Sequence, residues 1–281
     1  MTEPSLLLLI PAYNEERRIE PVLKLYGRYF QENYHGKFQL VVVLNGCTDD
    51  TLAVVQRVGE EYPSVTALEF TAAIGKGGAL IEGLKLAPLA DLIGYVDADG
   101  ATPPHAFHEL VKHMPGYDCV IGSRWLPDSV LHVEQSGNRR FASRVFHFIV
   151  QTLFRMNIKD TQCGAKVMRR EAVQNVHSTL LIADMAFDIN LLYSLHRAGY
   201  KILEVPTEWT DKIGTKVTLF RTSLAMFLSA VRIRLIYWPT LYRLLRPLKP
   251  LEVWIYKKLR APQPLSSKPP AGAGETPAQG S

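Results

Sequence analysis

Short apolar runs and longer amphipathic runs alternate along the first two hundred residues, and this alternation limits the folds open to the chain. The apolar runs are too short for buried helices and rich in aliphatic residues, which favours strands buried on both faces. They span residues 5–10, 39–44, 65–70, 92–96 and 117–122. Helical patterns lie between them, at residues 15–34, 51–62, 77–87 and 104–114. The alternation predicts an α/β fold with a mostly parallel sheet and helices on both of its faces.

The pattern becomes less regular after residue 122. A polar loop is expected at 125–137 and a polar, mobile loop at 208–216. Further elements are expected between them: helices at 138–155 and 185–198, and strands near 165–168 and 201–206. Thr102 is predicted to cap the helix at 104–114, with Pro103 or Pro104 as its first residue.

The C-terminal part differs in charge from the rest of the chain. Residues 216–260 hold ten basic side chains and one acidic one, whereas the whole chain carries a net charge of +5. The longest charge-free run there, residues 222–231, is about half of the ~20 residues that a membrane span needs. We therefore expect amphipathic helices that lie on a membrane surface, the alternative being surface helices packed on the core. The predicted division is a catalytic domain at 1–216, interfacial helices at 217–260 and a disordered tail at 261–281.

Three classes of protein are disfavoured by simple features. The three cysteines, Cys47, Cys119 and Cys163, are widely spaced and odd in number, so a disulfide framework or a zinc site is not expected and a reducing compartment is favoured. The first apolar run has no basic segment before it and is interpreted as a strand, not a signal peptide. The basic residues of the C-terminal part alternate with Leu, Ile and Trp, which argues against nucleic acid as a partner.

Two carboxylates, Asp97 and Asp99, stand at the end of the apolar run 92–96. Ligands of parallel α/β sheets bind at the carboxyl ends of the strands. Residues i and i+2 of a strand face the same way, so both side chains can converge on one point. An ordinary turn is the simpler alternative, because Asp and Gly are common turn residues. A divalent cation held by the two carboxylates is the interpretation that their position favours.

Other polar residues follow neighbouring strands. Asn14 and Glu15 follow the first strand, and Asn45 and Asp49 follow the second. Such side chains can bind a nucleobase and ribose, or they can cap helices. Lys76, flanked by glycines at the start of a helix, suits a diphosphate. The surrounding sequence has the spacing of neither the phosphate-binding GxxxxGK[ST] loop nor the GxGxxG fingerprint.

Taken in order, the segments PAYNEE, NGCTDDT, GKGGAL, DADGATP, IGSR and DTQCGAK resemble the inverting family-two glycosyltransferases with a GT-A fold. The resemblance spans roughly residues 4 to 220 and is strongest to the polyprenyl-phosphate sugar synthases. DADGAT, DTQCG, AFDxxLL and a WTxxxGTK loop are similar to the dolichyl-phosphate glucosyltransferase type. The mannosyl type usually carries DADxQHPP instead.

The resemblance implies a role for each part of the site. Asp97 and Asp99 would ligate Mg²⁺ or Mn²⁺, and Asp97 would also lie near the sugar of a UDP-sugar donor. The remaining donor-binding residues would be Pro11, Tyr13, Glu15, Asn45 and Lys76. The phosphate of a polyprenyl-phosphate acceptor would be bound by Arg124, Arg139 and Ser143. Catalysis would then rest on Asp97, Asp99 and Arg124, on the cytoplasmic face of a membrane to which the protein binds peripherally.

The chain also departs from the family pattern. The second loop reads LNGC where DDGS is usual, and Asn190 replaces a common Glu. The N-terminal membrane anchor that is common in the glucosyl type is not expected here. The alternatives that remain are a GDP-mannose-dependent mannosyltransferase, a transferase to a soluble hydroxyl acceptor with Asp188 as base, and a non-catalytic nucleotide-sugar-binding protein. A hydroxyl needs a base because its pKa lies far above neutrality, whereas a phosphate acceptor is already anionic.

Overall fold

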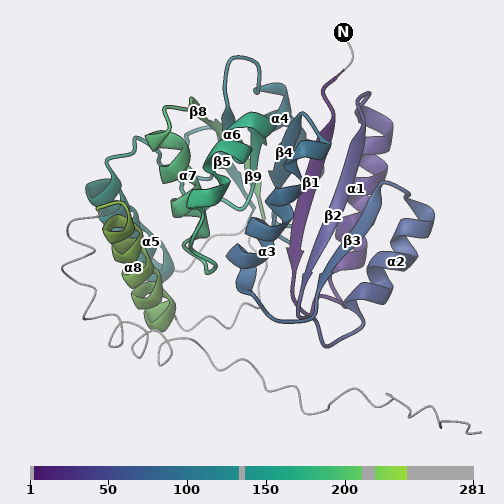
Figure 1. The fold of residues 1–281 in the computed structure, drawn as a ribbon, viewed down its shortest axis with the longest axis horizontal. Helices are drawn as coiled ribbons and strands as arrows, with labels where there is room; N and C mark the ends of the chain where they lie inside the picture. The colour runs from purple at the N-terminus through teal and green to yellow at the C-terminus, as the bar shows by residue number, and fades with distance from the viewer. Residues whose placement is uncertain (1–2, 133–136, 211–218, 239–281) are drawn as a thin grey trace, which may run out of the picture.

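The computed structural model describes residues 3–132, 137–210 and 219–238, without the side chains at 137–143, 145 and 219–225. A seven-stranded sheet in the order β3-β2-β1-β4-β7-β5-β8 forms its centre. Strand β7 runs antiparallel to both of its neighbours, and the other pairs are parallel. The mostly parallel α/β fold predicted from the alternating runs is confirmed (Figure 1).

The strands lie where the apolar runs predicted them. Their bounds are β1 Leu6–Ala12, β2 Phe38–Asn45, β3 Val65–Phe70, β4 Leu92–Tyr95, β5 Cys119–Ser123, β7 Lys166–Arg169 and β8 Ile202–Pro206. A separate two-stranded sheet pairs β6 (Val130–Leu131) with β9 (Glu208–Trp209) in parallel. Because β6 and β9 fall in segments expected to be loops, that part of the loop prediction is wrong.

Helices cover both faces of the sheet. Leu7 and Leu9 of β1 point to one hydrophobic cluster and Leu6, Leu8 and Ile10 to the other, as the two-residue period of a strand requires. One face is covered by α1 (Ile19–Asn33), α2 (Thr51–Glu61) and α4 (Pro104–Lys112). The other face is covered by α3 (Gly75–Gly83), α5 (Gly137–Phe154), α6 (Arg170–Val176), α7 (Phe187–Arg197) and α8 (Leu219–Ile236).

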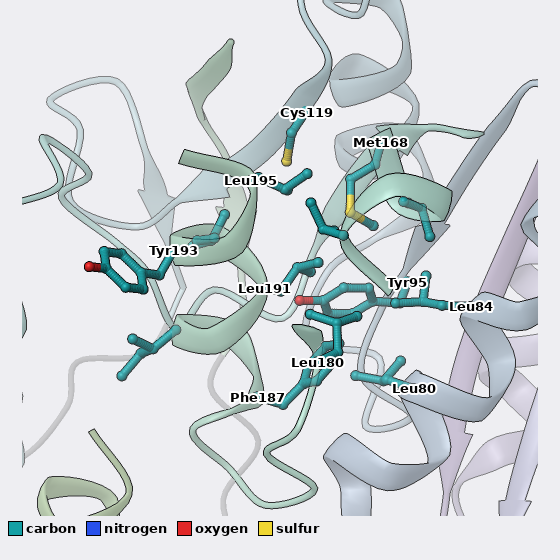
Figure 2. Packing of buried hydrophobic residues seen from close by; sticks show 14 of the residues in the cluster. Leu80, Leu84, Tyr95, Cys119, Met168, Leu180, Phe187, Leu191, Tyr193 and Leu195 are labelled. Carbon is teal, nitrogen blue, oxygen red and sulfur yellow. The ribbon is translucent and has the colours of Figure 1, made fainter. Parts of the chain in front are cut away.

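The buried residues of the second face pack closely around β4. Figure 2 shows the ring of Tyr95 between Leu84, which follows α3, and Leu191 of α7. Tyr95, Leu84 and Leu191 are each at most 1% exposed. The hydroxyl of Tyr95 points toward α7, so a polar group lies within an otherwise apolar layer (Figure 2).

Two helix ends differ from the prediction. The helix expected at 77–87 begins earlier, at Gly75, and its α-helical part ends at Gly83. The chain then continues as the 3₁₀ helix η1 (Leu84–Leu89), which contains Pro88. Proline lacks the N–H that an α-helix needs and its ring crowds the preceding turn, which accounts for the change. Pro103 rather than Thr102 is the N-cap residue of α4, with no side-chain cap; Thr102 is buried, and its carbonyl accepts a hydrogen bond from Tyr26. A second short 3₁₀ helix, η2 (His177–Thr179), follows α6.

Helix α8 lies beside α5 and packs on the core (Figure 1). Ala230 and Ile233 have no exposed surface, and both belong to the same hydrophobic cluster as α7. Beyond the helix, the hydroxyl of Tyr237 bonds to Ser194 of α7 at 2.5 Å. Residues 226–238 therefore pack on the core, residues 239–281 lie outside the described part of the chain, and the contact with a membrane surface stays a prediction.

Replacing Ile233 by Ala should lower the free energy of unfolding by about 3 kcal/mol, because it leaves a cavity under α8. Urea denaturation followed by circular dichroism measures the change. Leu89→Ala is the matched control: this side chain is 67% exposed, so its loss should change stability by no more than about 0.5 kcal/mol. Equal stability of the Ile233 variant and the unaltered protein would contradict the packing of α8 on the core.

Candidate functional site

A pocket of about 270 Å³ lies where β1 and β2 end at the carboxyl edge of the sheet. It is lined by Pro11, Ala12, Tyr13, Asn45, Gly75 and Lys76. Four of the residues expected to bind the nucleotide, Pro11, Tyr13, Asn45 and Lys76, thus surround one cavity. This is the location at which open parallel sheets bind ligands.

The fifth expected residue, Glu15, does not line the pocket. Both of its carboxylate oxygens accept hydrogen bonds from Arg18, each at 2.8 Å. Its backbone N–H donates to the hydroxyl of Thr51 at the start of α2. In this arrangement Glu15 joins the loops that follow β1 and β2.

Asn45 holds the start of α3 in place. Its side-chain oxygen accepts the backbone N–H groups of Ile74 and Gly75, at 2.6 and 3.2 Å. The N–H of Gly78 bonds to the carbonyl of Ala183, at 3.1 Å. These three amides therefore bond within the protein, and the ammonium of Lys76 adds a positive charge at the start of α3.

Lys76 forms an ion pair with Asp97, with 2.5 Å between Nζ and Oδ1. Burial opposes the charge of Lys76, but the charges of Asp97 and Asp188 outweigh it and raise its pKa above the ordinary value. Lys76 therefore carries a positive charge at the pocket throughout the neutral range. The pair joins the start of α3 to the end of β4.

Gly164 allows Asp97 to take this position. A Cβ atom at residue 164 would lie 2.2 Å from Oδ2 of Asp97 and 2.6 Å from its Cγ. Any side chain at 164 would force the carboxylate away from the backbone of the 160–166 segment. The glycine of the DTQCG motif thus has a steric function beside the pocket.

Asp99 lies two residues beyond Asp97, and its Oδ1 accepts the N–H of Ala101 at 2.9 Å. Burial, together with repulsion from Asp97, raises the pKa of Asp99 above its ordinary value of 3.8. Repulsion of this kind is relieved when a cation lies between the carboxylates. Among the described residues, no group of three or more His, Cys, Asp or Glu side chains is arranged to hold a metal ion. The two carboxylates fit a Mg²⁺ or Mn²⁺ ion that takes its remaining oxygen ligands from substrate phosphates and water.

Arg124 is bound by a carboxylate that the sequence did not single out. Its Nε and Nη2 donate to Asp160 at 2.7 and 2.9 Å, and its backbone N–H donates to the same group. The guanidinium also lies over the ring of Trp209, 4.9 Å from the centroid. The charge of Asp97 is among those that act on Arg124, so the arginine and the strand-end carboxylates belong to one charged region.

Asp160 keeps its negative charge despite being 3% exposed. Burial alone would raise its pKa, but the charge of Arg124 and their hydrogen bonds lower it below the ordinary value. Asp160 therefore fixes the orientation of Arg124, whose side chain keeps 17% of its surface exposed. Arg139 and Ser143 lie four residues apart on α5, but their side chains are outside the described part of the structure.

Asp188 is 3% exposed and lies within the protein, not at its surface. It forms an ion pair with Lys166 at 2.5 Å and accepts a hydrogen bond from Tyr95. Burial opposes its charge, but Lys166 and Lys76 lower its pKa below the ordinary value. A base with a lowered pKa and two donors on its carboxylate is poorly suited to take a proton from a hydroxyl acceptor.

The residues missed by the sequence reasoning lie in one motif. Asp160, Gly164 and Lys166 all belong to DTQCGAK, which was recognised only as part of the resemblance. A charged residue inside a predicted buried strand was the available signal for Lys166, because such a residue needs a partner.

Burial raises the pKa values of Cys119 and Cys163 to about 12, so these thiols are protonated at neutral pH.

No helix in the described ranges is both long and apolar enough to cross a membrane.

Comparison with known proteins agrees with this architecture. The family model described as "Glycosyl transferase family 2" matches residues 8–176. Dolichyl-phosphate beta-glucosyltransferase of Dictyostelium discoideum is 34% identical over 246 residues, which cover 83% of this chain and 74% of the relative. Glycosyltransferase AglD of Haloferax volcanii is 31% identical over 222 residues; they cover 78% of this chain but 35% of that relative's length.

The fold is also similar to that of a solved structure. Glucosyl-3-phosphoglycerate synthase from Mycobacterium tuberculosis, solved with Mn²⁺, uridine diphosphate and phosphoglyceric acid, gives a TM-score of 0.62. The match covers 82% of this chain and 78% of that one, at 19% sequence identity. The likeness supports the GT-A type of fold.

Replacing Gly164 by Ala should reduce glycosyl transfer and weaken Mn²⁺ binding at least about tenfold, because the added methyl group displaces Asp97 from its place beside Asp99. Initial rates and the electron paramagnetic resonance signal of free Mn²⁺ measure the two effects. Gly116→Ala is the control: its positive φ of 85° makes this variant less stable too, but nothing lies within 4 Å of a Cβ there, so Mn²⁺ affinity should be kept. Normal Mn²⁺ affinity in the Gly164 variant would show that Asp97 does not contribute to the metal site.

Replacing Asp160 by Asn should destabilise the protein by about 3 kcal/mol at neutral pH, because it leaves the guanidinium of Arg124 without its partner charge. The pKa of Asp160 is lower in the folded than in the unfolded chain, so its contribution is complete above the ordinary value of 3.8. That contribution is lost as the pH falls through the lowered value. Urea titrations at a series of pH values should therefore give a constant stability difference near neutrality and a shrinking one in acid. A difference that shrinks already between pH ~7 and ~5 would contradict this assignment.

Proposed function

The chain belongs to glycosyl transferase family 2, and we propose that it transfers glucose from UDP-glucose to a polyprenyl phosphate, with inversion and with a divalent cation. The observation that carries the proposal is the Lys76–Asp97 ion pair at the pocket, with Asp99 two residues away. A cation and two carboxylates in this position suit a nucleoside diphosphate and its metal ion. The relative from Dictyostelium supports the glucosyl group and the lipid phosphate by its name.

In this proposal the pocket holds the nucleotide. Pro11, Tyr13 and Asn45 bound the space for the base and ribose, and Lys76 faces the diphosphate. The solved relative, which carries uridine diphosphate and Mn²⁺ on a similar fold, supports the choice of uridine and of a divalent metal. When bound at Asp97 and Asp99, the metal ion supplies Lewis-acid stabilisation to the phosphate oxygens.

The leaving group develops negative charge as the bond between the sugar and the diphosphate breaks. Lys76 stabilises that charge, since its raised pKa keeps it protonated. The acceptor oxygen attacks from the opposite face of the sugar, which inverts the configuration. A phosphate acceptor is anionic at neutral pH and needs positioning more than it needs a base.

Arg124 positions the acceptor phosphate, assisted by Arg139 and Ser143 of α5. Arginine suits this task because its planar guanidinium remains charged and binds phosphate oxygens with directed N–H groups. The hydrogen bonds that Arg124 donates to Asp160 fix the direction of the guanidinium before the acceptor arrives. Such preorganisation reduces the ordering that binding requires.

The acceptor is a membrane lipid, and we place the protein peripherally on the cytoplasmic face of its membrane. The basic side chains of residues 216–260 suit anionic headgroups. The large exposed side chains Phe148 and Trp238, at 72% and 50% exposure, lie on or just after the helices α5 and α8. The free cysteines suit a reducing compartment.

Incubating the protein with UDP-glucose, Mg²⁺ or Mn²⁺ and a short polyprenyl phosphate should yield a glucosylated lipid phosphate, identified by mass spectrometry. Parallel reactions with GDP-mannose and with hydroxyl acceptors test the two alternative transferases. Product from GDP-mannose alone would overturn the choice of donor. Product from a hydroxyl acceptor but not from the lipid phosphate would overturn the choice of acceptor.

Reversing Arg139 to Glu separates the acceptor from the donor. Lipid-phosphate glucosylation should fall at least about a hundredfold, whereas UDP binding should change less than about threefold, because the variant places a negative charge against the acceptor phosphate only. Arg144→Glu, an exposed residue of the same helix, is the control and should keep both activities. Unchanged turnover in the Arg139 variant would contradict its assignment to the acceptor.

A further inference from the structure

Lys166 is a charged residue with no exposed surface, although lysine is almost never fully buried. It is the first residue of β7, between β4 and β5 in the sheet. Its ammonium forms the ion pair with Asp188 at 2.5 Å and also donates to the carbonyl of Cys163. Burying a charge is costly unless it is well paired, so this position requires an explanation beyond packing.

Asp188 connects this lysine to the pocket. Its Oδ1 accepts both the Lys166 ammonium and the Tyr95 hydroxyl, from β7 and β4. The start of α3 also packs against the start of α7, because a Cβ atom at Gly77 would lie 2.7 Å from the Cβ of Phe187. These are the residues next to Lys76 and Asp188, so the two opposite charges lie near each other and each favours the charged form of the other. Lys76 in turn pairs with Asp97 at 2.5 Å. Negative and positive groups thus alternate from the pocket into the core, in the order Asp97, Lys76, Asp188 and Lys166.

We propose that Lys166 is a positioning residue that neutralises Asp188, so that Lys76 remains paired with Asp97 and directed at the diphosphate of the donor. The inference rests on the proposed function in one respect, the assignment of the pocket to a diphosphate. It gives Asp188 a role other than that of a base. The carboxylate stabilises the charge of Lys76 from the core side, and its ion pair with Lys166 prevents it from replacing Asp97 as the partner of Lys76.

The balance of charge shows why a buried Asp188 requires Lys166 beside it. Asp97, Asp99 and Asp188 face two lysines, so the region carries a net charge of −1 before any ligand binds. Without Lys166, Lys76 is the remaining cation beside Asp188, the region carries −2, and a diphosphate is repelled. Without the charge of Asp188, Lys76 keeps Asp97 as its partner and no repulsion is added. Loss of Lys166 therefore weakens anion binding, whereas loss of the Asp188 charge does not, although each loss disturbs the same buried pair.

The different effects of the two substitutions on diphosphate affinity provide the test. Lys166→Met, Asp188→Asn and the double variant are titrated calorimetrically with UDP, GDP and inorganic pyrophosphate, with a chelator present to remove metal ions. Their thermal stabilities are measured in parallel. Asn at 188 keeps an oxygen that can accept the Tyr95 hydroxyl, and Met at 166 keeps the length of the side chain.

The inference expects Lys166→Met to weaken diphosphate binding about tenfold and Asp188→Asn not to weaken it. The double variant should return to within about threefold of the unaltered protein, since neither buried charge remains. Arg169→Met is the matched control. Arg169 is the last residue of the same strand, where it donates to the carbonyl of Tyr117, and its loss should leave diphosphate binding unchanged.

A purely structural pair would give another result. If both single variants lose affinity in proportion to their loss of thermal stability, or if Lys166→Met binds diphosphate normally, the inference is overturned. An unaltered protein that binds GDP or pyrophosphate but not UDP would refute the proposed donor while the charge test still applies. Failure of the unaltered protein to bind any of the three anions would overturn both proposals.

Discussion

The ion pair between Lys76 and Asp97 is the interaction on which the pocket depends, because it joins the start of helix α3 to the loop that follows strand β4. Lys76 opens α3 on one side of the sheet, and Asp97 follows the central strand β4. Each group would be poorly tolerated in this half-buried position without the other. In the proposed function, the pair holds Lys76 in place to face the diphosphate and Asp97 in place to bind the metal ion.

The 160–166 segment extends this arrangement to the other side of the site. Asp160 binds Arg124, Gly164 leaves room for Asp97, and Lys166 pairs with Asp188. These three contacts reach β5, β4 and α7, since the segment leads into β7 between the two parallel parts of the sheet. A short stretch therefore sets the positions of the donor-side carboxylates and the acceptor-side arginine together. A displacement of one side is transmitted to the other through covalently connected residues.

The sequence predicted what depends on local pattern and missed what depends on long-range pairing. The buried strands were found because each is a short aliphatic run. The family resemblance named Pro11, Tyr13, Asn45 and Lys76 as donor-binding residues, and the structure places these four around one pocket. The partners of Arg124 and Lys166 lie 36 and 22 residues away, and nothing in the local pattern indicates such a pairing. The two-residue strands β6 and β9 are too short to show a period, so they were interpreted as loops.

The burial of Asp188 favours an acceptor that carries its own negative charge. A hydroxyl acceptor requires a carboxylate that is accessible and able to take a proton, and Asp188 is neither, since it is enclosed and held ionised by Lys166 and Lys76. An anionic phosphate instead requires positive charge, and Arg124 supplies it in the same charged region as Asp97. Two anionic substrates can share one site only if cations separate them. In the proposed function, Lys76 on the donor side and Arg124 on the acceptor side provide that separation, each paired with a carboxylate that sets its direction.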